Sequence, residues 1–179
     1  MNKIKYMLKN TIYVLTLKNV PELYWTSPYK YNLKPKKITL SYLILGVILI
    51  GIGEALVISS NIGVSPWFVL HQGLSVITGY TIGTTTFVVS ICVLIFWLPL
   101  KERPGIGTIL NAIFISIMVD ISLQLLPNSN LFILKILQVF FGIFLCGIGS
   151  GFYLTANLGA GPRDGLMTGI NKKTNLSFF

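Results

Sequence analysis

The chain has 179 residues and a formal net charge of +9, and 53% of its residues are hydrophobic while only 11% are charged. A soluble globular domain carries about 25% charged residues, so this composition excludes an ordinary soluble protein and indicates a membrane protein. The basic excess does not point to nucleic acid, because eight of the fourteen Lys and Arg residues precede the first long apolar stretch, where they set membrane topology.

The amino-terminal segment, residues 1–39, is basic and aromatic. A signal peptide is the alternative reading, but the apolar run 11–17 is short, Lys18 follows it, and no small-residue cleavage site appears. We expect a basic cytoplasmic or interfacial segment ahead of a transmembrane domain at 40–179. Its apolar residues recur at loosely helical spacing between the lysines: Ile4, Leu8, Ile12 and Leu15.

Four apolar stretches follow, each near the roughly 20 residues that cross about 30 Å of hydrocarbon. Helices pair their own backbone groups in lipid, and the alternating pattern of a barrel strand is missing. The sequence therefore predicts an all-α fold, a polytopic membrane helical bundle. The segment 61–81 is Gly-rich, and after Pro66 it is too short to cross the bilayer, so we expect a short broken or re-entrant helix there. The expected spans are 40–60, 82–100, 108–126 and 131–156.

The loops between these stretches differ in charge. Basic residues occur at the amino terminus and in the loops 101–104 and 163–173, whereas 61–81 and 127–130 contain no Lys or Arg. By the positive-inside rule the basic loops are cytoplasmic. We therefore expect a multi-pass protein of the bacterial cytoplasmic (inner) membrane with its amino terminus in the cytoplasm.

An internal repeat relates residues 51–74 to residues 147–170 at an offset of 96, with eight of 24 positions identical. Three expected spans separate equivalent points, and an odd number means that the second copy enters the membrane from the opposite side. Inverted repeats with broken helices are a recurrent construction of transporters. The most specific shared pattern is Asn-x-Gly-x-x-Pro, formed by Asn61, Gly63 and Pro66 and again by Asn157, Gly159 and Pro162.

These turns have a definite physical chemistry. Glycine permits a positive φ, proline suits the first helical turn, and the start of a half-helix carries partial positive charge. A polar or anionic group could bind there, and after Gly161 and Pro162 the guanidinium of Arg163, beside Asp164, is suited to carboxylate or phosphate. We take these turn residues as candidates for the substrate path, and the alternative is that both turns only cap helices.

Three ionisable residues are expected at or near membrane depth. Glu54 and Asp120 lie toward the outer ends of two spans, and His71 lies on the external half-helix, so the three side chains could converge. Such groups mark a pathway or relay by default. The alternatives are that a carboxylate near a helix end reaches interfacial water, that Glu54 is protonated and bonded to a carbonyl, and that His71 is a polar tip at the interface.

Metal and cofactor chemistry is not expected. His71 is the only histidine, and Cys92 and Cys146 lie singly in apolar stretches, where packing explains them. The glycines 147, 149 and 151 follow no strand, so they do not form a dinucleotide-binding loop, and no ATP-binding loop is present.

Several of these segments resemble the YczE/YyaS/YitT family of bacterial membrane proteins over about residues 38–175: GIGEALVISSNIGVSPW at 51–67, the stretch from Asp120 to Pro127, and NLGAGPRDGLMTGI at 157–170. The resemblance implies a multi-pass protein of the cytoplasmic membrane without a firmly assigned activity. The chain departs from the family at Phe68, where members carry an acidic residue. It also ends at Phe179, where the repeat predicts a further span, so we expect an incomplete second repeat and a truncated reading frame.

We expect a small-solute transporter or transporter-like protein, with the lipid bilayer and an unknown small solute as partners and no nucleic acid. The second hypothesis is a non-transporting accessory or structural membrane protein, or an inactive fragment. A membrane enzyme is the third and least favoured, because no nucleophile, metal set or acid and base pair is apparent. A homo-oligomer is compatible with either of the first two hypotheses.

Overall fold

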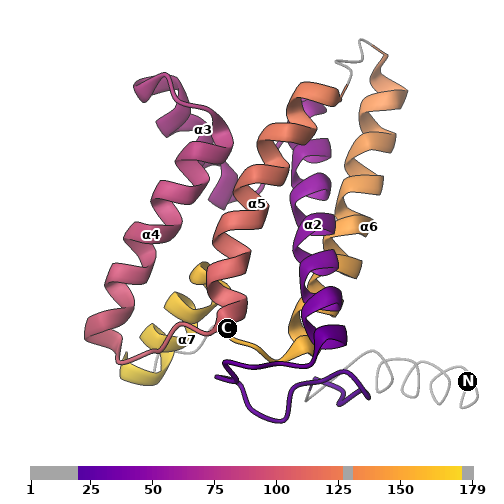
Figure 1. Cartoon of the computed structure of the whole chain (residues 1–179). Helices are drawn as coiled ribbons and strands as arrows, with labels where there is room; N and C mark the ends of the chain where they lie inside the picture. Colours follow the sequence, from indigo (N-terminus) through magenta and orange to yellow (C-terminus); the bar gives the residue numbers. More distant parts are fainter. Residues whose placement is uncertain (1–19, 127–130, 175–179) are drawn as a thin grey trace, which may run out of the picture.

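The structure is a computed structural model that describes residues 20–126 and 131–174. The described residues form six helices and no strand, as expected of an all-α membrane protein (Figure 1). The first 19 residues of the expected basic segment 1–39, the loop 127–130 and residues 175–179 lie outside the described residues. The helices are α2 (Lys37–Ser59), α3 (Pro66–Thr78), α4 (Ile82–Leu100), α5 (Ile106–Leu125), α6 (Phe132–Ala156) and α7 (Pro162–Thr174).

Helices α2, α4, α5 and α6 are the four that are long and apolar enough to cross a membrane. Their bounds differ from the expected spans by at most three residues. Their large apolar side chains also cover the outside of the bundle. In α6 only 11% of the most apolar 18-residue stretch is buried within the protein. A helix that is apolar on its exposed side is matched to lipid rather than to water.

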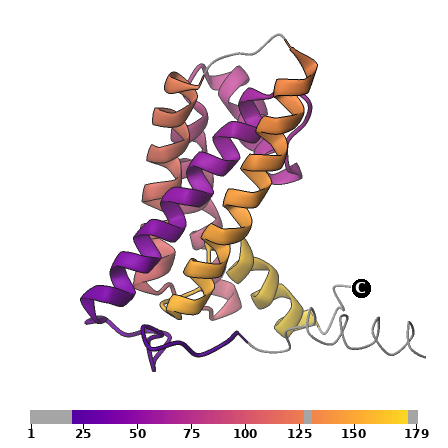
Figure 2. The same cartoon turned by 90° about the vertical axis from the view of Figure 1, so that its right-hand side faces the viewer.

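The two short helices, α3 and α7, have 13 residues each, or about 20 Å at 1.5 Å per residue, which is too short for a span of about 30 Å. They lie at opposite ends of the bundle (Figures 1 and 2). Helix α4 packs against α3, α5 and α7, while α2 packs against α5 and most extensively against α6. The expected short broken helices are therefore present.

Glycines bring α2 and α6 into backbone contact. A Cβ atom built on Gly46 would lie 2.7 Å from the carbonyl oxygen of Gly149, and one on Gly149 would lie 2.5 Å from that of Gly46. The second contact joins Gly53 and Gly142, at 2.6 Å in both directions. Small residues permit this close approach, which supplies the dispersion contacts that hold helices together in lipid.

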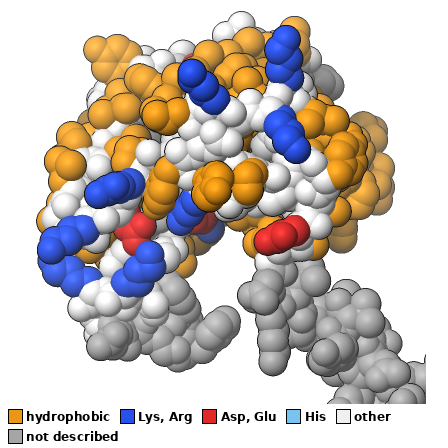
Figure 3. Space-filling view, turned by 60° about the horizontal axis from the view of Figure 1, so that its bottom comes forward, with side chains coloured by type: hydrophobic (Ala, Val, Ile, Leu, Met, Phe, Trp, Pro, Cys, Tyr) orange, Lys and Arg blue, Asp and Glu red, His pale blue; other side chains and the backbone are white. Residues whose placement is uncertain are grey.

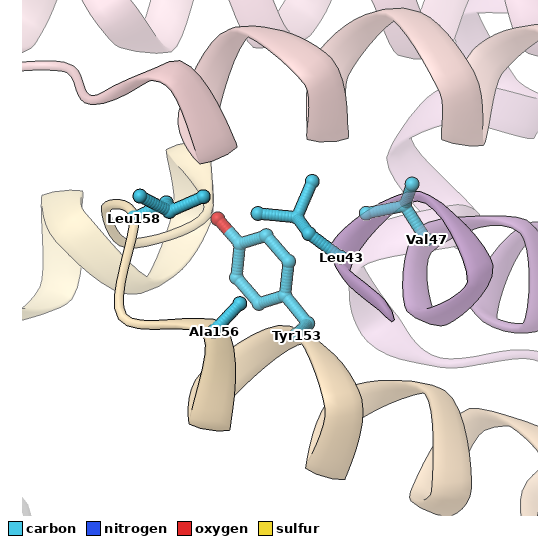
Figure 4. Packing of buried hydrophobic residues seen from close by; sticks show 5 residues of the cluster. All are labelled: Leu43, Val47, Tyr153, Ala156 and Leu158. Carbon is cyan, nitrogen blue, oxygen red and sulfur yellow. The ribbon is translucent and has the colours of Figure 1, made fainter. Parts of the chain in front are cut away.

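A buried apolar cluster lies at the end of the bundle where α2 begins. Leu43 and Val47 come from α2, Tyr153 and Ala156 from α6, and Leu158 from the loop before α7 (Figure 4). The Tyr153 ring stands among these side chains and is only 3% exposed. This cluster fixes the loop that leads into α7.

Each span that precedes a half-helix is followed within two residues by an asparagine in the left-handed backbone conformation. Asn61 has φ 54° and Asn157 has φ 52°, and their backbone N–H groups donate to Ile58 and Leu154 at 3.2 Å. Asparagine tolerates this conformation because its short side chain bonds locally. The expectation that glycine supplies the positive φ holds for Gly159, at 125°, but is wrong for the first turn, where Asn61 rather than the glycine two residues later adopts it.

Candidate functional site

A cavity of about 270 Å³ lies inside the bundle, with lining residues from all six described helices. It contains the sequence-predicted Glu54 from α2 and His71 from α3. The loop before α7 and its first turn contribute Gly161, Pro162, Arg163 and Asp164. The first turn of α3 contributes Trp67 and Phe68, so both half-helices begin at this cavity although they lead to opposite ends of the bundle.

The start of α3 is electrostatically uncompensated. Its first turn holds no acidic residue, and the Ser65 side chain makes no capping hydrogen bond. The Ser65 hydroxyl is buried and has no hydrogen-bond partner among the described residues. Since the first N–H groups of a helix have no partner within it, this end presents partial positive charge and free donors to the site.

His71 is completely buried, and its ring lies edge-on to Trp67 and Phe68, with centroids 5.5 and 5.0 Å away. Its Nδ1 atom is 3.0 Å from the Thr86 hydroxyl oxygen. That hydroxyl donates its single proton to the Ile82 carbonyl at 2.7 Å. Thr86 therefore accepts from His71, and the proton of the neutral ring is on Nδ1.

The second ring nitrogen of His71 faces a different environment. Burial lowers the pKa of His71 to about 4, so the ring is neutral at neutral pH. With the proton on Nδ1, Nε2 is a hydrogen-bond acceptor. It is buried and has no partner among the described residues, and His71 is one of the residues that line the cavity. An unsatisfied buried acceptor costs about 1–3 kcal/mol, so a hydrogen-bond donor that reached this atom would be stabilised there.

Three charged side chains share the cavity. Glu54 makes no hydrogen bond or ion pair within the described part of the chain, and Arg163 supplies an opposite charge that acts on it. Arg163 Nε lies 3.9 Å from Asp164 Oδ1, which is a loose contact that leaves most guanidinium donors open. The Asp164 side chain is 57% exposed. Partial burial by the surrounding protein raises the pKa of Asp164, and the positive charge of Arg163 acts in the opposite direction.

Sequence reasoning missed several polar residues at the cavity, among them Tyr153 and Asn111. Tyr153 lines the cavity and has a buried hydroxyl without a hydrogen-bond partner among the described residues, and Asn111 lines the cavity from α5. Both are polar groups inside strongly apolar stretches. A polar residue within an apolar stretch is therefore a sequence signal for this cavity even when the side chain is not ionisable.

Helix α7 is held in place by α4. The indole N–H of Trp97 donates to the Pro162 carbonyl at 3.0 Å, and the same ring packs directly against Gly165. At the far end of α7, Lys172 Nζ lies 2.6 Å from Glu102 Oε1. These contacts fix the position of Arg163 and its neighbours at the cavity.

Asp120 does not join Glu54 and His71. It accepts hydrogen bonds from the Thr81 hydroxyl at 2.6 Å and the Gly83 N–H at 2.7 Å. A carboxylate at a helix start satisfies free donors and the local dipole, so Asp120 holds the beginning of α4 against α5.

Five turn candidates also lie outside the cavity lining: Asn61, Gly63, Pro66, Asn157 and Gly159. Asn157 donates through its side-chain amide to the Ser27 carbonyl at 2.8 Å, and Gly159 packs against Gly105 and Thr108. Pro66 begins α3 beside the cavity-lining Trp67. Within the described residues no group of three or more His, Cys, Asp and Glu side chains is placed to hold a metal ion.

Comparisons with known proteins agree with the expected family. Residues 37–179 match the model of a family of unknown function, DUF6198. The chain is 40% identical to an uncharacterized protein of Haemophilus influenzae over 153 residues, which is 86% of this chain and 66% of the relative. It is 34% identical to the uncharacterized membrane protein YczE of Bacillus subtilis over 131 residues, 72% of this chain and 61% of YczE.

A third relative is the uncharacterized protein YyaS of Bacillus subtilis, 28% identical over 139 residues, which is 74% of this chain and 69% of YyaS. The chain thus spans about two thirds of the length of these curated relatives. No solved structure matches it. Four described helices are long and apolar enough to span a membrane, and one of the similar proteins, YczE, is a membrane protein. Because residues 37–179 match its model, this chain belongs to the family DUF6198 and is a membrane protein similar to YczE and YyaS.

Proposed function

We propose that this protein is a small-solute transporter or transporter-like protein of the bacterial cytoplasmic membrane, and that the cavity between the two half-helices is its solute site. The observation that carries the proposal is that two cavity-lining residues, His71 and Tyr153, each have a buried polar atom, Nε2 and the hydroxyl, without a hydrogen-bond partner among the described residues. The volume, about 270 Å³, lies near the lower end of the roughly 300–1,000 Å³ of ligand pockets, which suits a small solute.

An inverted repeat is part of the proposal, and the glycine contacts support it. At an offset of 96 residues, the contact of Gly46 with Gly149 corresponds to that of Gly142 with Gly53, and both occur. Ile50 corresponds to Cys146, and the Cys146 thiol donates to the Ile50 carbonyl at 3.7 Å. A two-fold axis between two copies makes every contact occur twice, once in each direction, and makes a residue near the axis contact its own equivalent. Such an axis in the membrane plane is characteristic of transporters.

The proposed orientation places the beginning of α2 in the cytoplasm. Basic side chains are visible at that end of the bundle (Figure 3), where α2 begins and α4 and α7 end. Lys37 begins α2, Lys101 follows the end of α4 and Lys172 lies in the last turn of α7. This distribution favours a cytoplasmic location by the positive-inside rule.

Flux measurements on the full chain reconstituted in lipid vesicles test the proposal. We expect uptake of a small polar solute that Glu54→Gln or Arg163→Gln reduces at least tenfold without loss of inserted protein. Matched controls are Glu22→Gln and Arg103→Gln, which remove the same charges from exposed positions outside the cavity. Absence of flux for anionic, cationic, zwitterionic and neutral solutes would contradict transport and favour the accessory role.

A further inference from the structure

The charges at the cavity limit the class of solute. Glu54 and Asp164 are acidic and Arg163 is basic. The start of α7 is compensated by Asp164 in its first turn, whereas the start of α3 has no acidic residue there and retains about half a positive charge. Negative and positive groups therefore nearly balance. A phosphate-like anion would meet two carboxylates, and a simple cation would meet the guanidinium and the α3 terminus.

The hydrogen-bonding groups add a second requirement. His71 Nε2 is a buried acceptor and the Glu54 carboxylate has no hydrogen bond within the described part of the chain, so both suit an N–H donor. Arg163 keeps open donors, and residues of the first turn of α3, which has no side-chain cap, line the same cavity. These suit a carboxylate, which guanidinium groups bind in a planar, two-point geometry.

We propose that the cavity binds a small zwitterionic solute that carries both a carboxylate and a primary or secondary ammonium group, the chemistry of a small amino acid. The ammonium donates to His71 Nε2 and Glu54, and the carboxylate accepts from Arg163. Trp67 and Phe68 line the same wall, where aromatic faces favour a cationic group. The proposal rests on the cavity being the solute site of the proposed function.

Equilibrium binding to the full chain in detergent tests this solute class with L-alanine, glycine betaine, glycerol and inorganic phosphate as probes. Glycine betaine has the same two charges as L-alanine but no N–H donor. We expect L-alanine to bind at least about tenfold more tightly than glycine betaine, because a hydrogen bond to a charged group contributes about 1.5–3 kcal/mol. Glycerol and phosphate should bind more weakly still.

Two variants assign the contacts. His71→Phe keeps a ring but removes the acceptor, so it should weaken L-alanine about tenfold and leave the weaker binding of glycine betaine unchanged. Glu54→Gln should weaken L-alanine, whereas its exposed match Glu22→Gln should not. Thermal unfolding of each variant shows whether it is folded, and a His71→Phe protein that loses both zwitterions equally would overturn the hydrogen-bond assignment.

The outcomes separate this inference from the proposed function. Equal binding of L-alanine and glycine betaine, or preferential binding of glycerol or phosphate, would overturn the solute class. Vesicle flux of one of those other solutes would retain transport while removing the amino-acid chemistry. Binding of L-alanine with no flux in vesicles would leave the inference standing and overturn transport.

Discussion

The glycine contacts between α2 and α6 make the strongest stability prediction. Replacing Gly46, Gly53, Gly142 or Gly149 with alanine adds a methyl group 2.5–2.7 Å from a backbone carbonyl oxygen of the facing helix. Backbone oxygens cannot turn aside as a flexible side chain can. The helices must therefore move apart, and the neighbouring contacts along the seam weaken with them.

The magnitude follows from these distances. An ordinary Cβ contact lies at 3.4–4 Å, so each substitution requires a local separation of roughly 1 Å. Overpacking of this kind costs typically about 1–3 kcal/mol. Gly147 and Gly151 lie on the same helix α6 with nothing within 4 Å of an added Cβ. Alanine there should be neutral or should stabilise by about 0.5–1 kcal/mol, since glycine is the poorer helix former.

Equilibrium unfolding of the purified chain in mixed detergent measures the effect. The Cys146 thiol is a built-in reporter, because it lies in the α2–α6 interface, and Cys92→Ala removes the exposed second thiol. We expect the four interface variants to unfold at lower denaturing-detergent fractions and to expose Cys146 to thiol reagent earlier. If they behave like Gly147→Ala, the α2–α6 interface is not formed as described.

Three further predictions concern individual side chains. Asp120→Asn should destabilise the protein by about 1 kcal/mol, because it weakens the cap of α4. Solute binding in the separate cavity should stay unchanged. Unfolding and binding measurements on the same samples check both expectations. Burial lowers the pKa of His71 from 6.5 to about 4 in the folded protein. Between these pH values the unfolded chain binds a proton at His71 and the folded chain does not. The free energy of unfolding should therefore fall as pH drops from 6.5 through 4, by at most about 3 kcal/mol. His71→Phe should flatten that part of the measured pH profile, and an unchanged slope would count against a buried neutral ring. Trp97→Phe removes the hydrogen bond to the Pro162 carbonyl and should cost about 1 kcal/mol, with weaker solute binding because Arg163 loses its support; unaltered affinity would show that this contact does not position the site.

Much of the fold was predictable from the sequence because lipid imposes simple constraints. Stretches of about 20 apolar residues must be helices that satisfy their own backbone, and the four spans differ from the expected bounds by at most three residues. Pro66 and Pro162 mark the starts of α3 and α7 for a local reason, since proline suits a first helical turn and interrupts what precedes it.

The site was predictable only in part. An ionisable residue in an apolar stretch identified Glu54, and the Gly-Pro-Arg-Asp string identified Arg163 and Asp164, which do line the cavity. The sequence could not separate these from Asp120, whose carboxylate is satisfied by the start of α4. Nor could it show that Asn157 bonds to Ser27, 130 residues away.

The sequence by itself determined that the chain is helical, apolar and interrupted at two related turns, because these properties depend on neighbouring residues and on the solvent around them. Only the tertiary structure decided which polar groups face one another. Glu54, His71 and Tyr153 come from three helices, and their shared cavity depends on helix packing angles and on the glycine contacts of α2 with α6. Those are set by side-chain fit between distant segments, which no local pattern encodes.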